Sequence, residues 1–507
     1  MKRILSLLFA FSLLVSLAAC GERAPAAPHT AEDAAPSKTT LPESEPETAA
    51  EEILRDPTGF SVGFSRRVIT PKISVPLAGY GNTSYRFSKS KLDDITVTCV
   101  AFSDGESRAL LITQDLIRAV KDFTDFTREK LAKATGVPFD NIFICCTHTH
   151  SSVDPSSTEG AVSIWKASYY KEIVGACLDA IADLDHARIS IASCRPEGMN
   201  YVRRYFLKDG THLGDNSGTV ATNENPIAAH ESEVDNEMQL IYFSCENAPD
   251  VVLANWQGHP TITGGSSRTD ISADYVGPFR KQLEEDLGVR AAFYLGSSGN
   301  VNVFGRMEGE NHPRDHKKYG KELAAYAEEA LKKATPLPDG KISALTVNVS
   351  LPSNKKDADN AERIRQAQEI TEIYKRNDRE SAKGLCRKYG FSSYFAASSL
   401  LARRSYPEFY TVPISGIRVG RLSFIAAPYE MFDTNQMAIK EKTPFDMTFI
   451  CTVSNAHFNY IPSSFAYPNG GYEVDTCRFQ MGAAEILEQH FIGVLNALYE
   501  GTSYSAE

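Results

Sequence analysis

The feature that most constrains the fold of this chain is a repeated alternation of short apolar runs with longer segments of helical periodicity. Residues 109–113 and 141–146 are apolar runs of the length of a buried strand, and residues 120–134 between them carry apolar side chains at helical spacing. A strand, a helix and a second strand at this spacing form a βαβ unit, which is typical of α/β proteins.

Similar elements continue almost to the end of the chain. Further strands are predicted at residues 239–243, 251–256, 290–295, 422–427 and 447–453, and further helices at residues 170–184 and 278–287. Residues 357–388 are highly charged and have helical character, so we expect a surface insertion there. The fold class is therefore predicted to be α/β, with one large domain over residues 57–507 built as a mixed sheet flanked by helices.

The N-terminus has the features of a targeting signal. Lys2 and Arg3 precede an apolar stretch, which ends in Leu17-Ala18-Ala19-Cys20. This order is typical of a secretory signal, and small residues that lead directly into a cysteine resemble the bacterial lipobox. We predict that residues 1–20 are a lipoprotein signal peptide whose Cys20 becomes the lipidated first residue of the mature chain. A simple cleaved signal peptide with an incidental cysteine is the alternative.

The segment after Cys20 is predicted to be a tether. Residues 21–56 are rich in alanine, proline and acidic residues, with almost no large apolar side chain before Ile53. Such a composition cannot bury enough apolar surface to offset its chain entropy, so we expect a disordered acidic linker. The protein is therefore predicted to be lipid-anchored in the cell envelope, outside the cytoplasm.

Charge and cysteine content exclude several other classes of protein. The chain has 53 basic and 64 acidic residues, a net charge of −11, which argues against nucleic acid because phosphate binding needs a basic surface. No internal apolar run approaches the ~18 residues of a membrane span. Cys20 is one of 10 cysteines; the others form no CxxC motif, and we expect them mostly as buried small side chains.

Possible metal ligands directly follow four of the predicted strands. They are His148 and His150 after residues 141–146, His259 after residues 251–256, Glu430 after residues 422–427, and Tyr460 after residues 447–453. In α/β sheets, ligands bind at the carboxyl ends of strands. Two imidazoles, a carboxylate and an oxygen donor suit a catalytic Zn²⁺, which keeps a position open for water. Taken singly, each residue also has a plainer interpretation as a solvated or half-buried side chain.

In this order the clusters resemble those of the neutral/alkaline non-lysosomal ceramidases, over nearly the whole chain from about Gly59 onward. The resemblance is carried by Val62-Gly63-Phe64-Ser65, Val68-Ile69-Thr70-Pro71, Pro76-Leu77-Ala78-Gly79-Tyr80-Gly81, Thr147-His148-Thr149-His150-Ser151, His259-Pro260-Thr261, Pro428-Tyr429-Glu430, residues 455–460 and Tyr472-Glu473. The combination is specific, although no single motif is.

The resemblance implies roles for individual residues. The zinc ligands would be His148, His259, Glu430 and Tyr460. His150 would contact the substrate or the zinc-bound water. Arg203, with Arg204 as the second choice, would hold a polar group of the substrate. The family hydrolyses the N-acyl bond of ceramide to sphingosine and a fatty acid.

Two departures from the family pattern leave the substrate open. Where the family has a serine, the segment Gly299-Asn300-Val301-Asn302-Val303 has Asn302. An amide cannot act as a hydroxyl nucleophile, but it can donate an N–H to a developing oxyanion; an ordinary strand-to-helix loop is the alternative interpretation. The chain also leaves no room after Glu507 for the immunoglobulin-like domain of the true ceramidases, so we expect only the catalytic domain.

The predicted function is zinc-dependent hydrolysis of an N-acyl amide bond by metal-activated water, with a small-molecule or lipid substrate. Two alternatives stay open. TIM-barrel metallo-hydrolases also carry an HxH motif after a strand, although eight regular βα units are not visible here. A non-catalytic envelope binding lipoprotein that retains the fold is the other.

The lipobox prediction can be tested by a single substitution. Cys20→Ala removes the thiol that would be acylated, so the variant should leave the membrane fraction or remain unprocessed. Fractionation and immunoblotting measure both results. Unchanged membrane attachment would show that the interpretation of Cys20 is wrong.

Overall fold

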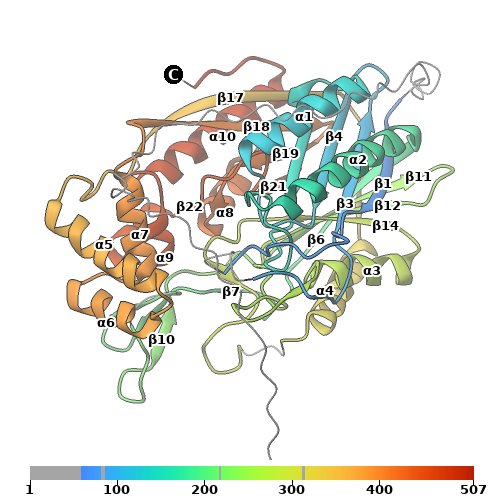
Figure 1. Cartoon of the computed structure of the whole chain (residues 1–507). Coiled ribbons are helices and arrows are strands. Elements are labelled where there is room, and N and C mark those ends of the chain that lie inside the picture. Colours follow the sequence, from blue (N-terminus) through green and yellow to red (C-terminus); the bar gives the residue numbers. More distant parts are fainter. Residues whose placement is uncertain (1–58, 81–85, 216–218, 311–313, 507) are drawn as a thin grey trace, which may run out of the picture. The chain divides into compact units, whose positions relative to one another are not determined.

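The computed structural model describes residues 59–80, 86–215, 219–310 and 314–506 (Figure 1). The predicted signal peptide, Cys20 and the predicted tether lie outside these residues, so those predictions stay predictions. Within the described part, no helix combines the length and the apolar character that a membrane span requires.

The larger of two main sheets has nine strands. They follow the order β14-β12-β11-β6-β1-β3-β4-β5, and β16 pairs with β6 outside this path. Their bounds are β1 (Ser61–Val68), β3 (Thr96–Ser103), β4 (Arg108–Gln114), β5 (Ile142–Cys146), β6 (Asp185–Cys194), β11 (Met238–Cys245), β12 (Val251–Trp256), β14 (Arg290–Leu295) and β16 (Thr335–Leu337). Only the pairs β4–β5 and β12–β14 are parallel, so this sheet is mixed and mainly antiparallel.

A second sheet packs against the first. It has the order β17 (Ile342–Pro352), β18 (Phe409–Val419), β19 (Leu422–Ala427) and β21 (Met447–Thr452). Apolar side chains of both sheets meet in one core, where Phe102 of β3 stacks on Phe424 of β19 with ring centroids 6.0 Å apart. Because successive side chains of a strand point to opposite faces, the other face of each sheet is left for helices.

Helices cover the two outer faces. The outer side of the large sheet packs against α1 (Lys121–Thr135), α2 (Gly160–Ala182), α3 (Val276–Leu287) and α4 (His316–Leu331). The outer side of the second sheet packs against α8 (Asp433–Lys442) and α10 (Ala483–Glu500). Figure 1 shows α1 and α2 across the strands β3 and β4, and α10 beside β17 and β18.

Three βαβ units with parallel strands organise the part of the fold that carries the candidate site. They are β4-α1-β5, β12-α3-β14 and β19-α8-β21. Parallel strands present their carboxyl ends at the same edge of a sheet. Because β14 also contacts both β5 and β21, the loops that follow β5, β12, β14, β19 and β21 begin close together, and all the predicted metal ligands lie in or just beyond these loops.

The predicted α/β class with helices flanking a mixed sheet is confirmed, and three predicted strands have the observed bounds of β12, β14 and β19. The expectation of one sheet was incomplete, because the apolar period of a strand does not reveal which sheet it joins. Helix α2 starts at Gly160 instead of residue 170, and its early turns bury Val162 and Trp165. A TIM barrel needs parallel strands throughout, so the largely antiparallel sheet excludes that alternative for the described residues.

A helical insertion separates β17 from β18. It consists of α5 (Ala361–Lys375), α6 (Arg379–Tyr389) and α7 (Tyr394–Arg403), drawn in orange in Figure 1. These helices bury a small core of their own around Ile370, Phe391 and Leu400. The predicted helical character is confirmed, and α7 extends the insertion beyond the predicted residues.

The cysteines behave as small apolar side chains. Cys99, Cys145, Cys146 and Cys177 are buried in the sheet cores, and all the cysteines of the described residues are free. The sequence interpretation, which preferred buried thiols to a disulfide framework, is confirmed for them.

A buried ion pair connects the large sheet to α3. Asp115 follows β4, and its Oδ2 accepts hydrogen bonds from Arg280 Nη2 (2.7 Å) and from the backbone N–H of Thr96 (2.8 Å). Its Oδ1 accepts from Arg280 Nη1 and from Thr147 Oγ1, the residue before His148. The side chains of Asp115 and Arg280 are 0% and 4% exposed, so water cannot replace either partner.

Breaking this pair should destabilise the protein strongly. Arg280→Met leaves the Asp115 carboxylate buried without its cation, which should lower the free energy of unfolding by about 3–5 kcal/mol. The matched control is Lys281→Met, because the Lys281–Glu285 pair is solvent-exposed (73% and 54%). Loss of this exposed pair should lower the free energy of unfolding by less than about 1 kcal/mol. Denaturant unfolding of both variants measures the difference; equal losses would contradict this role of the pair.

Candidate active site

Three histidines are held in one tautomer by the backbone. His148 Nδ1 lies 2.5 Å from the Ile117 carbonyl, His150 Nδ1 lies 3.1 Å from that of Gly79, and His259 Nδ1 lies 3.0 Å from that of Ser298. A carbonyl oxygen only accepts hydrogen bonds, so each Nδ1 must carry the proton. In its neutral form each ring therefore keeps an unprotonated lone pair on Nε2.

These lone pairs converge on one point. The Nε2 of His259 lies 3.1 Å from that of His148 and 3.0 Å from that of His150. Glu430 Oε2 lies 3.3 Å from His148 Nε2, and this buried oxygen has no hydrogen-bond partner among the described residues. Nitrogen and oxygen lone pairs at such distances repel one another unless a cation or a proton lies between them.

The spacing of these atoms fits a small metal ion. Ligands at about 2.0–2.1 Å from a tetrahedral ion lie about 3.3 Å from one another, close to the separations observed here. Possible ligand atoms of His148, His150 and His259 all lie within 4.8 Å of one another. Burial, reinforced by the neighbouring imidazoles, holds the pKa of both His150 and His259 well below its ordinary value. These two rings are therefore neutral at pH 7, as metal ligands must be. The cluster of His148, His150 and His259 could hold a metal ion.

Glu430 and Tyr460 are brought side by side by two short strands. β20 (Glu430–Met431) pairs with β22 (Tyr460–Ile461) in parallel, with Glu430 opposite Tyr460. Burial raises the pKa of Tyr460 well above its ordinary value, and the nearby Glu430 carboxylate adds to the rise. The Tyr460 hydroxyl accepts a hydrogen bond from Arg203 Nη2 at 3.2 Å.

His457 belongs to the site but was missed by the sequence analysis. Its Nε2 lies 3.1 Å from Glu430 Oε1, the carboxylate oxygen that faces away from His148. The only signal in the sequence was the position of His457 within residues 455–460, which carried the resemblance.

Of the two candidate arginines, Arg203 faces the site. Its Nη2 donates to the Gly299 carbonyl (2.7 Å), and its Nε donates to Glu473 (2.9 Å). Arg204 is fully buried and pairs with Glu231 and Glu473 instead. Arg203 is thus the arginine of the two that lines the cavity, and Glu473 orients it.

The loop after β14 places Asn302 beside His259. Asn302 forms a backbone bridge with His259 and belongs to β15 (Val301–Asn302), which pairs with β7 (Tyr201–Val202). The loop is fixed upstream of Asn302, where Asn300 exchanges hydrogen bonds with Asp433 at 2.7 and 3.0 Å. At Gly299 a Cβ atom would lie 2.7 Å from the Glu430 carbonyl, so only glycine permits this close approach.

Backbone strain is concentrated in the same loops. His148 (φ 65°), Val453 (φ 52°), Asn455 (φ 60°) and Asn459 (φ 64°) adopt the left-handed conformation, which costs non-glycine residues about 1–3 kcal/mol each. Asn455 compensates by pairing with β5, since its N–H donates to the Ile144 carbonyl and its Oδ1 accepts from the Ile144 N–H, both at 2.9 Å.

A cavity of about 850 Å³ opens above the histidines. It is lined by His150, His259 and Tyr460, and also by Arg203 and Asn302. His148 and Glu430 are buried behind this surface, at 2% and 6% exposure. A molecule in the cavity would therefore meet His150 and His259 before it reached the other two possible ligands.

The helical insertion forms part of the cavity wall. Tyr374 of α5, Arg379 of α6 and Phe395 of α7 line the cavity together with the residues of the sheet edge. The expectation of a plain surface insertion was therefore incomplete, because the charged sequence of the helices does not show where they dock.

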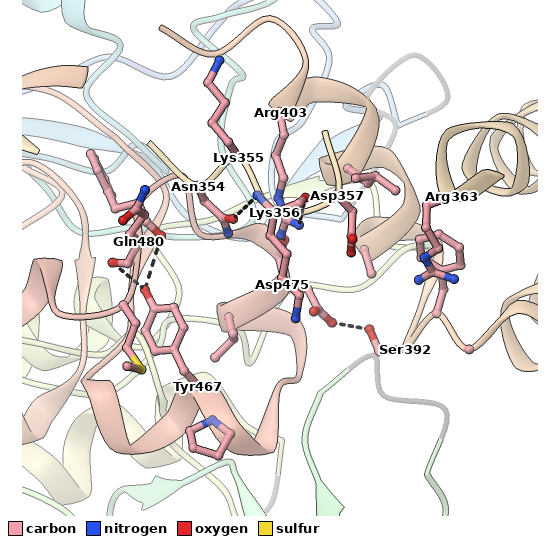
Figure 2. Close-up of a pocket in the computed structure, with 18 residues that line it drawn as sticks. Asn354, Lys355, Lys356, Asp357, Arg363, Ser392, Arg403, Tyr467, Asp475 and Gln480 are labelled. Atoms are coloured by element: carbon pink, nitrogen blue, oxygen red, sulfur yellow. Dashed lines mark hydrogen bonds between the residues drawn. The ribbon is translucent and has the colours of Figure 1, made fainter. Parts of the chain in front are cut away.

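Figure 2 shows how the insertion is joined to the rest of the protein, around a second cavity of about 810 Å³. The Ser392 hydroxyl donates a hydrogen bond to the Asp475 carboxylate. Arg403 is 8% exposed and donates to the carbonyls of Asp475 (2.9 Å) and Lys356 (3.2 Å). These contacts hold α7 against α9 (Tyr472–Thr476), which itself carries Glu473.

Comparison with known proteins identifies the fold. The sequence matches no known family model and no curated protein. The structure is similar to that of the neutral ceramidase from Pseudomonas aeruginosa, with a TM-score of 0.66 and 17% identity over 89% of this chain and 76% of that chain. A ceramidase complexed with C2 gives a TM-score of 0.65, with 17% identity over 89% and 77% of the two chains. The protein therefore has the neutral ceramidase fold, in a divergent sequence.

The position of His150 should depend on the absence of a side chain at Gly79. Gly79 has φ 110°, and a Cβ there would lie 2.5 Å from His150 Nδ1. Gly79→Ala should therefore displace the His150 ring from His259 in a crystal structure and lower the unfolding midpoint. Gly136→Ala is the control, because Gly136 also has a positive φ (73°) but nothing within 4 Å of a Cβ. An undisplaced His150 would contradict the expected clash.

Proposed function

We propose that this protein is a zinc-dependent hydrolase that cleaves the amide bond of N-acyl compounds. The observation that carries the proposal is the convergence of unprotonated imidazole nitrogens and an unpartnered carboxylate oxygen at the base of a cavity. The neutral ceramidase fold supports the reaction class, since the similar structures are those of ceramidases.

The proposed ligands are His148, His259, Glu430 and Tyr460. The ring orientations of the two histidines are fixed by backbone carbonyls, and Glu430 is held by His457, so little rearrangement is needed on binding. A zinc ion held there supplies Lewis-acid polarisation of the scissile carbonyl and a water nucleophile at neutral pH. The remaining chemistry is assigned to residues that line the cavity.

His150 is the proposed proton-transfer residue. His150 is partly open to the cavity, whereas His148 is buried. The ring of His150 packs edge-on against Tyr80, with centroids 5.2 Å apart. The Nε2 of an imidazole in this position can take a proton from the attacking water and pass it to the leaving amine. Arg203 orients a polar group of the substrate, and Asn302 or the loop N–H groups donate to the developing oxyanion. Asn302 has no hydroxyl, so the proposed reaction forms no acyl-enzyme at this position.

The proposed place of action is the cell envelope. The basis is the order of charge, apolar run and small residues before Cys20. A lipid anchor at Cys20 and the tether after it would allow the domain to reach N-acyl substrates at a membrane surface.

Metal content and activity test the proposal together. The purified protein should contain about one zinc per chain, and chelation should abolish hydrolysis of a panel of N-acyl lipids and small N-acyl amides until zinc is restored. His259→Ala should lose the metal, whereas the exposed-loop substitution Asp209→Asn should retain it. A folded His259→Ala protein with full zinc would contradict the ligand assignment. Stoichiometric zinc without hydrolysis of any N-acyl compound would favour the non-catalytic binding alternative.

The roles of His150 and Asn302 predict a large change in turnover for one substitution and a small change for the other. His150→Ala should lower turnover by roughly two to four orders of magnitude while zinc stays bound. Asn302→Ser should change turnover only modestly, because water rather than a side chain attacks. Steady-state kinetics and elemental analysis measure both. Loss of zinc from His150→Ala would assign this residue to the ligand set, and a trapped acyl group on the wild-type loop would overturn the water mechanism.

A further inference from the structure

The cavity above the histidines carries an excess of positive charge. Its lining in the described residues includes four arginines, Arg203, Arg306, Arg314 and Arg379, against the single carboxylate of Asp215. The whole chain has the opposite balance, with a net charge of −11. Because a cleft lined by charges of one sign concentrates their field in its opening, this cavity is suited to a ligand that carries negative charge.

Two of these arginines are neutralised within the protein. Arg203 pairs with Glu473 at 2.9 Å, and the same guanidinium contacts Tyr460. Arg306 pairs with Asp215 at 2.7 Å. Neither needs a further anion, so the excess of positive charge resides on the other two arginines.

Arg314 and Arg379 form no ion pair with any carboxylate of the described residues. The Arg314 guanidinium lies 4.6 Å from the ring centroid of Phe304, and that of Arg379 lies 5.8 Å from the ring of Tyr374. Contact with an aromatic face steadies an arginine and leaves its N–H edge free. That edge is suited to the two oxygens of a carboxylate or a phosphate.

Aromatic side chains connect the insertion with the candidate metal centre. Phe395 of α7 lies 5.2 Å from Tyr472, and Tyr472 lies 5.4 Å from Tyr460, as ring centroids. All three rings line the same cavity as Arg379 and His150. A substrate with its amide beside His150 can therefore lie along these rings and extend toward the insertion that carries Arg379, in the cavity that Arg314 also lines.

We infer that the substrate carries an anionic oxygen group, a carboxylate or a phosphate, which Arg314 and Arg379 bind while the amide lies beside His150 and His259. The inference rests on the proposed function and names the class of substrate for it. A neutral N-acyl lipid would displace water from the two guanidinium groups without offering them a hydrogen-bond acceptor. Desolvation of a charged group without a replacement partner is unfavourable. The helical insertion, through Arg379, is then a determinant of specificity.

Three N-dodecanoyl compounds that share one acyl chain provide the test. They are N-dodecanoylglycine with a carboxylate, N-dodecanoyl-O-phosphoethanolamine with a phosphate, and neutral N-dodecanoylethanolamine. For the full-length, zinc-loaded protein, we expect kcat/KM to be about tenfold higher for at least one anionic compound than for the neutral one, mostly through KM. The preference should shrink as salt is raised, because the two arginines are exposed and screened.

Substitution of the arginines should remove the preference selectively. Arg314→Gln and Arg379→Gln should each raise KM for the anionic compound about threefold and leave the neutral compound unchanged, as expected for exposed charge pairs. Arg376→Gln is the matched control, since Arg376 is an exposed arginine of the same insertion that does not line the cavity. Equal kcat/KM for all three compounds, or a preference that survives the double Arg314/Arg379 variant, would overturn the inference.

Binding separates this inference from the proposed function. If the wild-type protein hydrolyses none of the three compounds, the wider panel of N-acyl compounds decides the proposed function, and calorimetric binding of N-dodecanoylglycine and N-dodecanoylethanolamine still tests the arginines. Tighter binding of the anionic compound, lost in the double variant, would support the inference. Binding without preference would refute it.

Discussion

The site depends on three hydrogen bonds from histidine Nδ1 atoms to backbone carbonyls. These bonds fix the tautomer of His148, His150 and His259, and thereby leave three lone pairs directed at one point. Without them each ring could turn or place its proton on Nε2, and the nitrogens could then hydrogen-bond to one another. The three carbonyls come from separate parts of the chain, so the fold itself sets the protonation pattern on which metal binding would depend.

The arrangement of the sheets explains how this precision is reached. Each of the three parallel βαβ units ends in a loop at the same edge, and the loops are tied to one another rather than to solvent. Asn455 bonds to the backbone of Ile144, and Asn300 bonds to Asp433. The strained conformations of His148 and Val453 persist because the surrounding bonds leave the loops few alternatives.

The insertion gives the cavity its chemical character. A cavity without the insertion would present the histidines, Arg203 and Tyr460, together with Asp215, Arg306 and the unpaired Arg314. Tyr374, Arg379 and Phe395 add aromatic surface and an unpaired cation on one wall. In the proposed function, the insertion would thus contribute to substrate selection while the sheet loops carry the reaction chemistry, as is common when loops and insertions vary on a constant scaffold.

The sequence by itself determined the strands that carry the site and the residues that follow them. An apolar run and the polar residue after it are adjacent in the chain, so local pattern suffices to place His148, His259 and Glu430 at strand ends. Tertiary structure decided the pairing of strands into two sheets, the placement of Arg203 rather than Arg204 at the cavity, and the position of His457 beside Glu430. It also decided that a charged insertion lines the cavity. These features depend on contacts between residues far apart in the chain, and neither periodicity nor composition records which distant surfaces meet.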